Sequence, residues 1–150
     1  MKKRIIYGLL IIVWMITVFW FSAQNSDDSQ STSDVFTDKI VEILNISDEK
    51  KVSSVTEMVS FIVRKSAHFI IYFIGGFVIY GFMNTFDISS KNVLYYSILL
   101  GLVYAISDEI HQYFVPGRAA QIRDVFIDTF GVFLMSIIRW KIDSKKADTN

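Results

Sequence analysis

Four apolar segments dominate this sequence, and each is a candidate for a helix that crosses a membrane. They cover about residues 5–23, 66–86, 92–112 and 124–140. A bilayer core requires roughly 20 apolar residues in a helix, and in lipid every backbone polar group must be hydrogen-bonded within the protein. The sequence therefore predicts an all-α integral membrane four-helix bundle, with residues 1–150 forming a single domain.

The first segment could be either a membrane anchor or a cleaved signal peptide. Lys2, Lys3 and Arg4 resemble the basic start of a signal peptide. The apolar run that follows is longer than the usual 7–15 residues, and no small-x-small cleavage site ends it, because Phe21 lies two residues before Ala23. We interpret the segment as an uncleaved anchor.

The last two segments are short in their strictly apolar parts. Val125 to Ile138 would cover only about 21 Å of a core about 30 Å thick. To cross a membrane, these helices must include their polar ends. The ionisable residues between them are then expected at, or just inside, one membrane face.

Lysines and arginines predict the orientation. They flank the first segment, lie between the second and third, and follow the fourth: Lys2, Lys3, Arg4, Lys91, Arg139, Lys141, Lys145 and Lys146. Such residues favour the cytoplasmic side. We therefore expect a multi-pass membrane protein with both termini cytoplasmic, and with the turn between the third and fourth segments outside.

The acidic loop from Gln24 to about Ile62 is predicted to contain short amphipathic helices. Apolar residues recur at helical spacing between Val35 and Leu44, and a second set between Val52 and Val63 leads into the second segment. Such helices would lie on the outer membrane surface or cover the bundle.

Composition excludes several kinds of function. The chain has no cysteine, which excludes disulfides, thiolate metal sites and cysteine nucleophiles. Its 15 basic and 15 acidic residues give no net charge, so no nucleic-acid partner is predicted. The lipid bilayer is an expected partner; the oligomeric state stays open.

A first polar patch begins the second apolar segment. Arg64, His68 and Tyr72 are four residues apart and share one stripe of a helix, with Lys65 a turn before His68. The glycines Gly75–Gly76 follow and would allow a neighbouring helix to approach closely.

The third segment carries a stripe of small residues that ends in a carboxylate. Its members are four apart: Ser97, Gly101, Ala105 and Glu109. Asp108 and Gln112 lie beside it, also four apart.

The turn that follows holds the second patch. Pro116 and Gly117 end the helix and present Arg118. Asp124 and Asp128 then open the fourth segment one turn apart, and Asp128 lies inside an apolar run where the helix dipole alone does not explain a carboxylate.

Ionisable residues within membrane helices usually face the interior of the bundle and mark a functional site. We expect the two patches to meet in one pocket open to the outer leaflet. Acid–base roles are predicted for Glu109, Asp108, His68 and Asp124, and ligand binding for Arg118, Lys65, Arg64, Tyr72, Gln112 and Asp128. In the structural alternative, Arg118 and Arg123 pair with these carboxylates as internal struts.

Other chemistries have weaker support. His68 and His111, with the nearby carboxylates, are suitable ligands for a divalent ion, but no HExxH or other ligand spacing occurs, so no metal or cofactor is predicted. Ser66 and Ser107 are available as nucleophiles, but neither lies in a nucleophile elbow.

Three motifs together resemble the VanZ family: "FSAQNSDDSQSTS", "RKSAHFIIYFIGGF" and "DEIHQYFVPGRAAQIRDVFIDTFG". The matching positions in the last two include Lys65, His68, Tyr72, Asp108, Glu109, Gln112, Pro116, Gly117, Arg118, Asp124, Asp128 and Gly131. The resemblance implies a small bacterial membrane protein with four spans, linked to low-level resistance against teicoplanin-type glycopeptide antibiotics. It assigns no catalytic residue.

Three functions remain open at this stage. The first is a cell-envelope protein whose outer pocket binds its partner, a cell-wall precursor or a lipid headgroup that carries phosphate or carboxylate. The second is a membrane enzyme that uses the same pocket for acid–base chemistry on a lipid-linked intermediate. A transporter subunit is the third, and it is disfavoured because no charged stripe runs along the full length of the segments.

Overall fold

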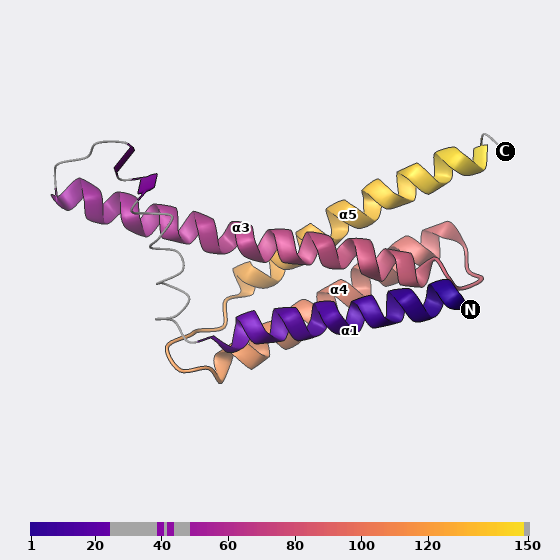
Figure 1. Ribbon diagram of the computed structural model, residues 1–150, viewed down its shortest axis with the longest axis horizontal. Helices are drawn as coiled ribbons and strands as arrows, with labels where there is room; N and C mark the ends of the chain where they lie inside the picture. The colour runs from indigo at the N-terminus through magenta and orange to yellow at the C-terminus, as the bar shows by residue number, and fades with distance from the viewer. Residues whose placement is uncertain (25–38, 41, 44–48, 149–150) are drawn as a thin grey trace.

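The computed structural model describes residues 1–24, 39–40, 42–43 and 49–148. Four long helices account for most of them: α1 (Lys2–Ala23), α3 (Glu49–Met83), α4 (Ser90–Tyr113) and α5 (Ile122–Asp148). The described residues contain no strand. The prediction of an all-α bundle is confirmed (Figure 1).

The helices run antiparallel in sequence order, which divides the molecule into two ends. α5 packs against α3 and α4, and α1 packs against α3 and α4 on the other side. Both chain termini and the turn between α3 and α4 lie at one end, while the turn between α4 and α5 lies at the other (Figure 1). The polar patches of α3, α4 and α5 are thereby brought to the same end of the bundle.

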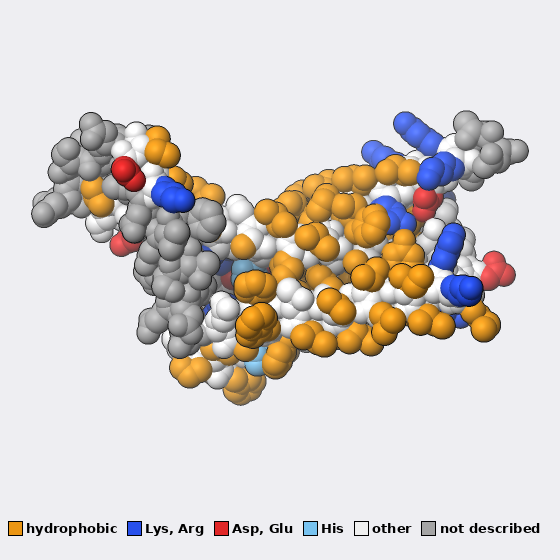
Figure 2. Space-filling model, viewed as in Figure 1, with side chains coloured by type: hydrophobic (Ala, Val, Ile, Leu, Met, Phe, Trp, Pro, Cys, Tyr) orange, Lys and Arg blue, Asp and Glu red, His pale blue; other side chains and the backbone are white. Residues whose placement is uncertain are grey.

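Three of the helices are long and apolar enough to cross a membrane: α1, α4 and residues Val52–Met83 of α3. In α1, Leu9, Ile16 and Trp20 are 59%, 63% and 69% exposed, and apolar side chains cover the middle of the face that Figure 2 shows. Such a surface suits contact with lipid. The protein is a membrane protein; α5, which contains the fourth predicted segment, is not among these three helices.

α3 differs from the sequence prediction in its length. Residues 52–63, expected as a separate amphipathic helix, continue without a break into the second apolar segment. The reason is local, because no glycine or proline interrupts the chain from Glu49 to Ile74. At 35 residues, α3 is about 52 Å long, and its N-terminal part projects beyond α1 and α4 (Figure 1). The other predicted amphipathic helix, 35–44, falls mainly outside the described residues.

Glycines allow α3 and α5 to approach each other closely. A Cβ atom on Gly131 of α5 would lie 2.8 Å from the carbonyl oxygen of Phe69, and one on Gly76 of α3 would lie 2.7 Å from the carbonyl oxygen of Val132. Side chains at these positions would therefore collide with backbone. Gly76 thus has the close helix contact that the sequence predicted for it, and this approach brings the carboxylates of α5 near the polar stripe of α3.

An aromatic cluster of Trp14, Tyr72 and Tyr104 holds α1 against its neighbours. The Trp14 ring centroid lies 4.8 Å from that of Tyr104 and 5.6 Å from that of Tyr72. Trp14 Nε1 donates to the carbonyl oxygen of Ile71 at 2.8 Å, and the Tyr104 hydroxyl donates to that of Met15 at 2.8 Å. Since Tyr72 follows His68 by one turn, this cluster lies next to the polar end of the bundle.

Candidate functional site

A tight turn between α4 and α5 positions Arg118. Gly117 has a φ of 75°, and the N–H of Arg118 donates to the carbonyl oxygen of Val115 at 3.1 Å. Proline followed by glycine with positive φ is the pattern of a type II turn, in which a residue other than glycine would be strained. From this turn, Arg118 Nη1 donates to Gln112 Oε1 at 3.3 Å.

The polar end of α4 faces the interior of the bundle. Asp108, Glu109 and Gln112 are only 5%, 4% and 4% exposed, because they continue the buried small-residue stripe of the same helix. Gln112 Nε2 donates to Asp108 Oδ2 at 3.1 Å. The buried carboxylates agree with the expectation that ionisable residues within these helices face the interior of the bundle.

Glu109 holds the start of α5 in place. Its Oε2 accepts a hydrogen bond of 2.7 Å from the backbone N–H of Gln121, the residue directly before the helix. Its other oxygen, Oε1, is buried and makes no hydrogen bond to any described residue. Oε2 of Glu109 therefore has a structural role, and Oε1 is available to bind another partner.

Lys65 pairs with Asp124, so α3 and α5 are joined by a salt bridge at the same end. The ammonium group donates to both carboxylate oxygens. The arginine struts considered from the sequence are not formed among the described residues: Arg118 bonds to Gln112, and Arg123 lies over the Phe61 ring at 5.5 Å. The predicted ligand-binding cation Lys65 already has a carboxylate partner.

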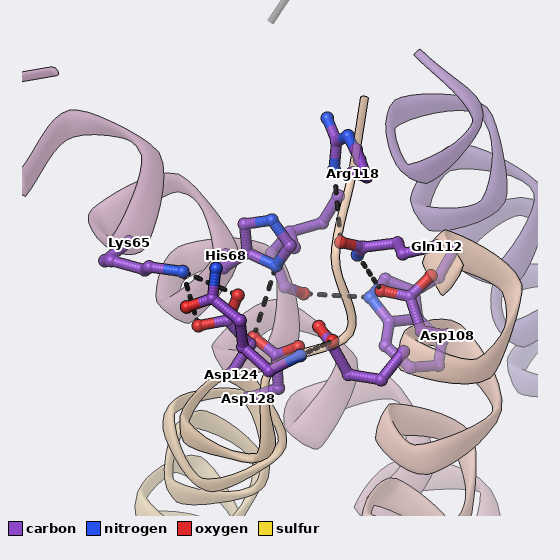
Figure 3. Close-up of polar contacts among 11 residues, drawn as sticks. Lys65, His68, Asp108, Gln112, Arg118, Asp124 and Asp128 are labelled. Carbon is purple, nitrogen blue, oxygen red and sulfur yellow. Dashed lines mark hydrogen bonds and ion pairs between the residues drawn. The ribbon is translucent and has the colours of Figure 1, made fainter. Parts of the chain in front are cut away.

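His68, Asp108 and Asp128 meet where α3, α4 and α5 come together. One nitrogen or oxygen atom from each lies within 4.8 Å of the others. His68 Nδ1 is 3.5 Å from Asp128 Oδ1, and Asp128 is 0% exposed. Figure 3 shows His68 between the α5 carboxylates and the pair formed by Asp108 and Gln112. The two polar patches therefore meet, as the sequence predicted.

A polar cavity of about 190 Å³ opens beside this cluster. Its lining includes Arg64, Lys65, His68, Arg118 and Asp124. Burial lowers the pKa of the Arg118 guanidinium from its ordinary value, but an arginine in a protein stays charged at neutral pH. The cavity is thus lined mainly by cationic and neutral polar groups.

An apolar groove of about 540 Å³ adjoins the cavity between α1 and α3. Arg64, His68 and Arg118 line both spaces. The remaining walls of the groove are largely apolar and include Val18 and Ile74. A polar space and an apolar space therefore share one wall of cationic and imidazole side chains.

The predicted site residues lie at one end of the bundle, but in different surroundings. Those that line the polar cavity are Arg64, Lys65, His68, Gln112, Arg118 and Asp124, while Asp108, Glu109, Asp128 and Tyr72 are buried behind it. Outside the site, His111 stacks on Phe19, and the Ser107 hydroxyl donates to the carbonyl oxygen of Tyr104.

Sequence reasoning missed Trp14, Tyr104 and Gln121. The two aromatic residues lie within apolar runs, and only the indole N–H and the phenol hydroxyl could have indicated that they form hydrogen bonds between helices. The part played by Gln121 rests on its backbone N–H, which no side-chain pattern reveals.

These features define a class: a helical membrane protein with a polar cavity at one end of its bundle. The family model described as VanZ/LLP1 matches residues 7–142. The chain belongs to this family, and the resemblance found in its motifs is confirmed. Searches of curated proteins and of solved structures gave no match.

Proposed function

We propose that this protein binds the phosphate-bearing headgroup of an envelope lipid at the outer face of a bacterial membrane, and thereby lowers susceptibility to teicoplanin-type glycopeptides. One observation carries the proposal: the polar cavity and the apolar groove share Arg64, His68 and Arg118. A lipid has the same two parts, a charged head and an apolar chain joined at one point.

The charge of the cavity supports an anionic ligand. Arg64 and Arg118 form no ion pair with any described carboxylate, whereas Lys65 is neutralised by Asp124. A guanidinium group offers a planar fork of donors that matches phosphate oxygens. We therefore assign headgroup binding to the two arginines. Lys65 is assigned a structural role, joining α3 to α5 through Asp124.

The groove supports a ligand that enters from the membrane. Its walls include Val18 and Phe21 of α1 and Ile70 and Ile74 of α3. Ile70 and Ile74 are 55% and 51% exposed, so the groove borders the apolar surface of the bundle. A lipid chain lying there would place its headgroup against Arg64 and Arg118.

The proposed topology has four spans with both termini in the cytoplasm and the cavity outside. Most of the Lys and Arg side chains visible in Figure 2 lie at the end that carries both termini, and residues of this kind close to the ends of the helices favour the cytoplasm for that end. In this arrangement, α5 crosses the membrane with its carboxylates turned into the bundle, where Asp124 and Asp128 are 5% and 0% exposed.

Lipid binding tests the proposal directly. The purified chain in detergent is titrated with a fluorescent phosphatidic acid and, separately, with the matching phosphatidylcholine. We expect preferential binding of phosphatidic acid, and a loss of at least about tenfold in affinity for Arg118→Ala or Arg64→Ala, since one charged hydrogen bond contributes about 1.5–3 kcal/mol.

Arg123→Ala is the matched control, because Arg123 lies at the same end but does not line the cavity. It should bind like the unchanged chain. Equal affinity for the two lipids, or equal losses in all three variants, would contradict the proposed headgroup site. If binding is as expected, expression in a susceptible host should raise teicoplanin resistance, and the two cavity variants should not, at equal membrane levels.

A second function, acid–base chemistry on the bound lipid, is favoured by the unpartnered Oε1 of Glu109. Glu109→Gln keeps an oxygen that can accept from the Gln121 N–H, so the fold should be preserved. An enzyme would lose its effect on resistance completely in this variant, whereas a binding protein would keep most of it.

A further inference from the structure

Three metal-ligating side chains from three different helices converge inside the bundle. They are His68 of α3, Asp108 of α4 and Asp128 of α5, with one ligand atom from each within 4.8 Å of the others. Figure 3 shows them around one point between the helices. No sequence spacing could show this cluster, because each ligand comes from a separate segment.

The cluster contains buried polar atoms that lack hydrogen bonds. His68 Nδ1 and Asp128 Oδ1 face each other at 3.5 Å as an ion pair, but neither atom makes a hydrogen bond, and Asp128 Oδ2 is also buried without a hydrogen-bond partner among the described residues. Asp128 is 0% exposed. Buried polar groups in folded proteins are almost always satisfied, and an exception calls for a missing water or ion.

The charges of the cluster also require a partner. Two carboxylates, those of Asp108 and Asp128, are buried around a single imidazole. Lys65 is already paired with Asp124, and neither Arg64 nor Arg118 forms an ion pair with these two carboxylates. Buried charge is costly unless it is paired or coordinates a metal ion.

We propose that His68, Asp108 and Asp128 bind one divalent transition-metal ion, of the zinc or manganese type. Imidazole nitrogen and carboxylate oxygen are common ligands of these ions. Bonds of about 2.0–2.2 Å place two ligand atoms at most about 4.4 Å apart. The 3.5 Å between His68 Nδ1 and Asp128 Oδ1 is already within this limit, and small side-chain movements bring in Asp108.

The position of this site relates it to the polar cavity, which His68 also lines. An ion with three protein ligands keeps a coordination position open. If the cavity holds a phosphate headgroup, as proposed above, one of its oxygens can take that position. The metal site itself does not depend on the lipid proposal, because its test uses the metal ion alone.

Metal binding is measured on the full chain, purified in detergent with a tag that contains no histidine and stripped with a chelator. The protein is incubated with Zn²⁺ alone, separated from free ion, and its metal content is determined by mass spectrometry. We expect close to one zinc per chain, and at least about a tenfold loss of affinity in His68→Gln, Asp108→Asn and Asp128→Asn. Replacing a residue that orients a metal ligand typically lowers metal affinity about 10- to 100-fold, and replacing a ligand itself should lower it at least as much.

Asp143→Asn is the matched control, because it makes the same chemical change on α5 at the opposite end of the bundle, beside Asn84. It should bind zinc like the unchanged chain. Zn²⁺ should also raise the melting temperature of the unchanged chain and of this control, but not that of Asp128→Asn.

X-ray absorption on the unchanged zinc-loaded chain provides a readout that does not depend on how the variants fold. It should show one imidazole nitrogen, with oxygen atoms as the remaining ligands. Less than about 0.2 zinc per chain, an all-oxygen ligand shell, or full binding by Asp128→Asn would each overturn the proposal.

Discussion

At the scale of single residues, the salt bridge between Lys65 and Asp124 joins α3 to α5 at the site. Replacing Lys65 with Met keeps most of the apolar stem but leaves the carboxylate of Asp124, 5% exposed, without its cation. We expect a loss of about 2–4 kcal/mol in the free energy of unfolding, close to the usual cost of breaking a buried pair. Thermal unfolding in detergent measures it.

The double variant Lys65→Met/Asp124→Asn separates this cost from the loss of packing. It removes both charges, so it should be more stable than Lys65→Met alone. A double variant that is less stable than the single one would show that the ion pair does not stabilise this end of the bundle.

The sequence could not predict which cation pairs with which carboxylate at this end of the bundle. The sequence placed Lys65, Arg118, Arg123 and the carboxylates at one depth, but gave no reason to prefer a particular pair. Which cation reaches Asp124 depends on how far α3 and α5 are rotated and how closely they approach. Those quantities depend on backbone contacts at glycines, not on the spacing of charges.

At the scale of the elements, the contact between α3 and α5 depends on Gly131. An alanine there would place its Cβ 2.8 Å from the Phe69 carbonyl oxygen and 3.0 Å from the Phe73 nitrogen. Both atoms belong to the backbone and cannot rotate away. We expect Gly131→Ala to lower the free energy of unfolding by about 1–3 kcal/mol, as overpacking of a close interface does, and to weaken metal binding by moving Asp128.

Gly8→Ala is the matched control, because the added Cβ would lie 3.7 Å from Phe82 Cε2, an ordinary contact. Alanine is the better helix former by about 1 kcal/mol, so this variant should be as stable as the unchanged chain or more stable. Thermal unfolding of both variants in the same detergent makes the comparison. Equal stability of Gly131→Ala and Gly8→Ala would contradict the close contact.

The elements themselves could largely be predicted from sequence, and the reason is physical. Apolar runs that must satisfy their backbone in lipid can only become helices, and the predicted segments 5–23 and 92–112 lie within α1 and α4. The start of α3 was harder to predict, because polar residues such as Lys65 suggested that a new helix begins there, whereas α3 runs through this position without a break. A helix ends where a residue caps or breaks it, and no glycine or proline occurs between Glu49 and Ile74 to do so.

At the scale of the whole molecule, the arrangement of charges predicts which end faces the cytoplasm. Most of the Lys and Arg side chains visible in Figure 2 lie where both termini lie. At that end Arg4 Nη2 donates to the Thr85 carbonyl oxygen at 2.8 Å, which joins α1 to the turn between α3 and α4. The site lies at the opposite end. A protein that acts on the outer leaflet requires this orientation, so topology and function can be tested together.

The chain has no cysteine, so single cysteines report topology without background. Right-side-out vesicles carrying Ala120→Cys, Ser90→Cys or Lys141→Cys are treated with a membrane-impermeant maleimide. Ala120, in the turn between α4 and α5, should react, because we propose that this turn lies outside. Ser90 and Lys141 should react only after the vesicles are opened, since they lie at the end assigned to the cytoplasm. Labelling of Lys141→Cys in closed vesicles would mean that α5 does not cross the membrane, and the carboxylates of Asp124 and Asp128 would then need another path to the interior.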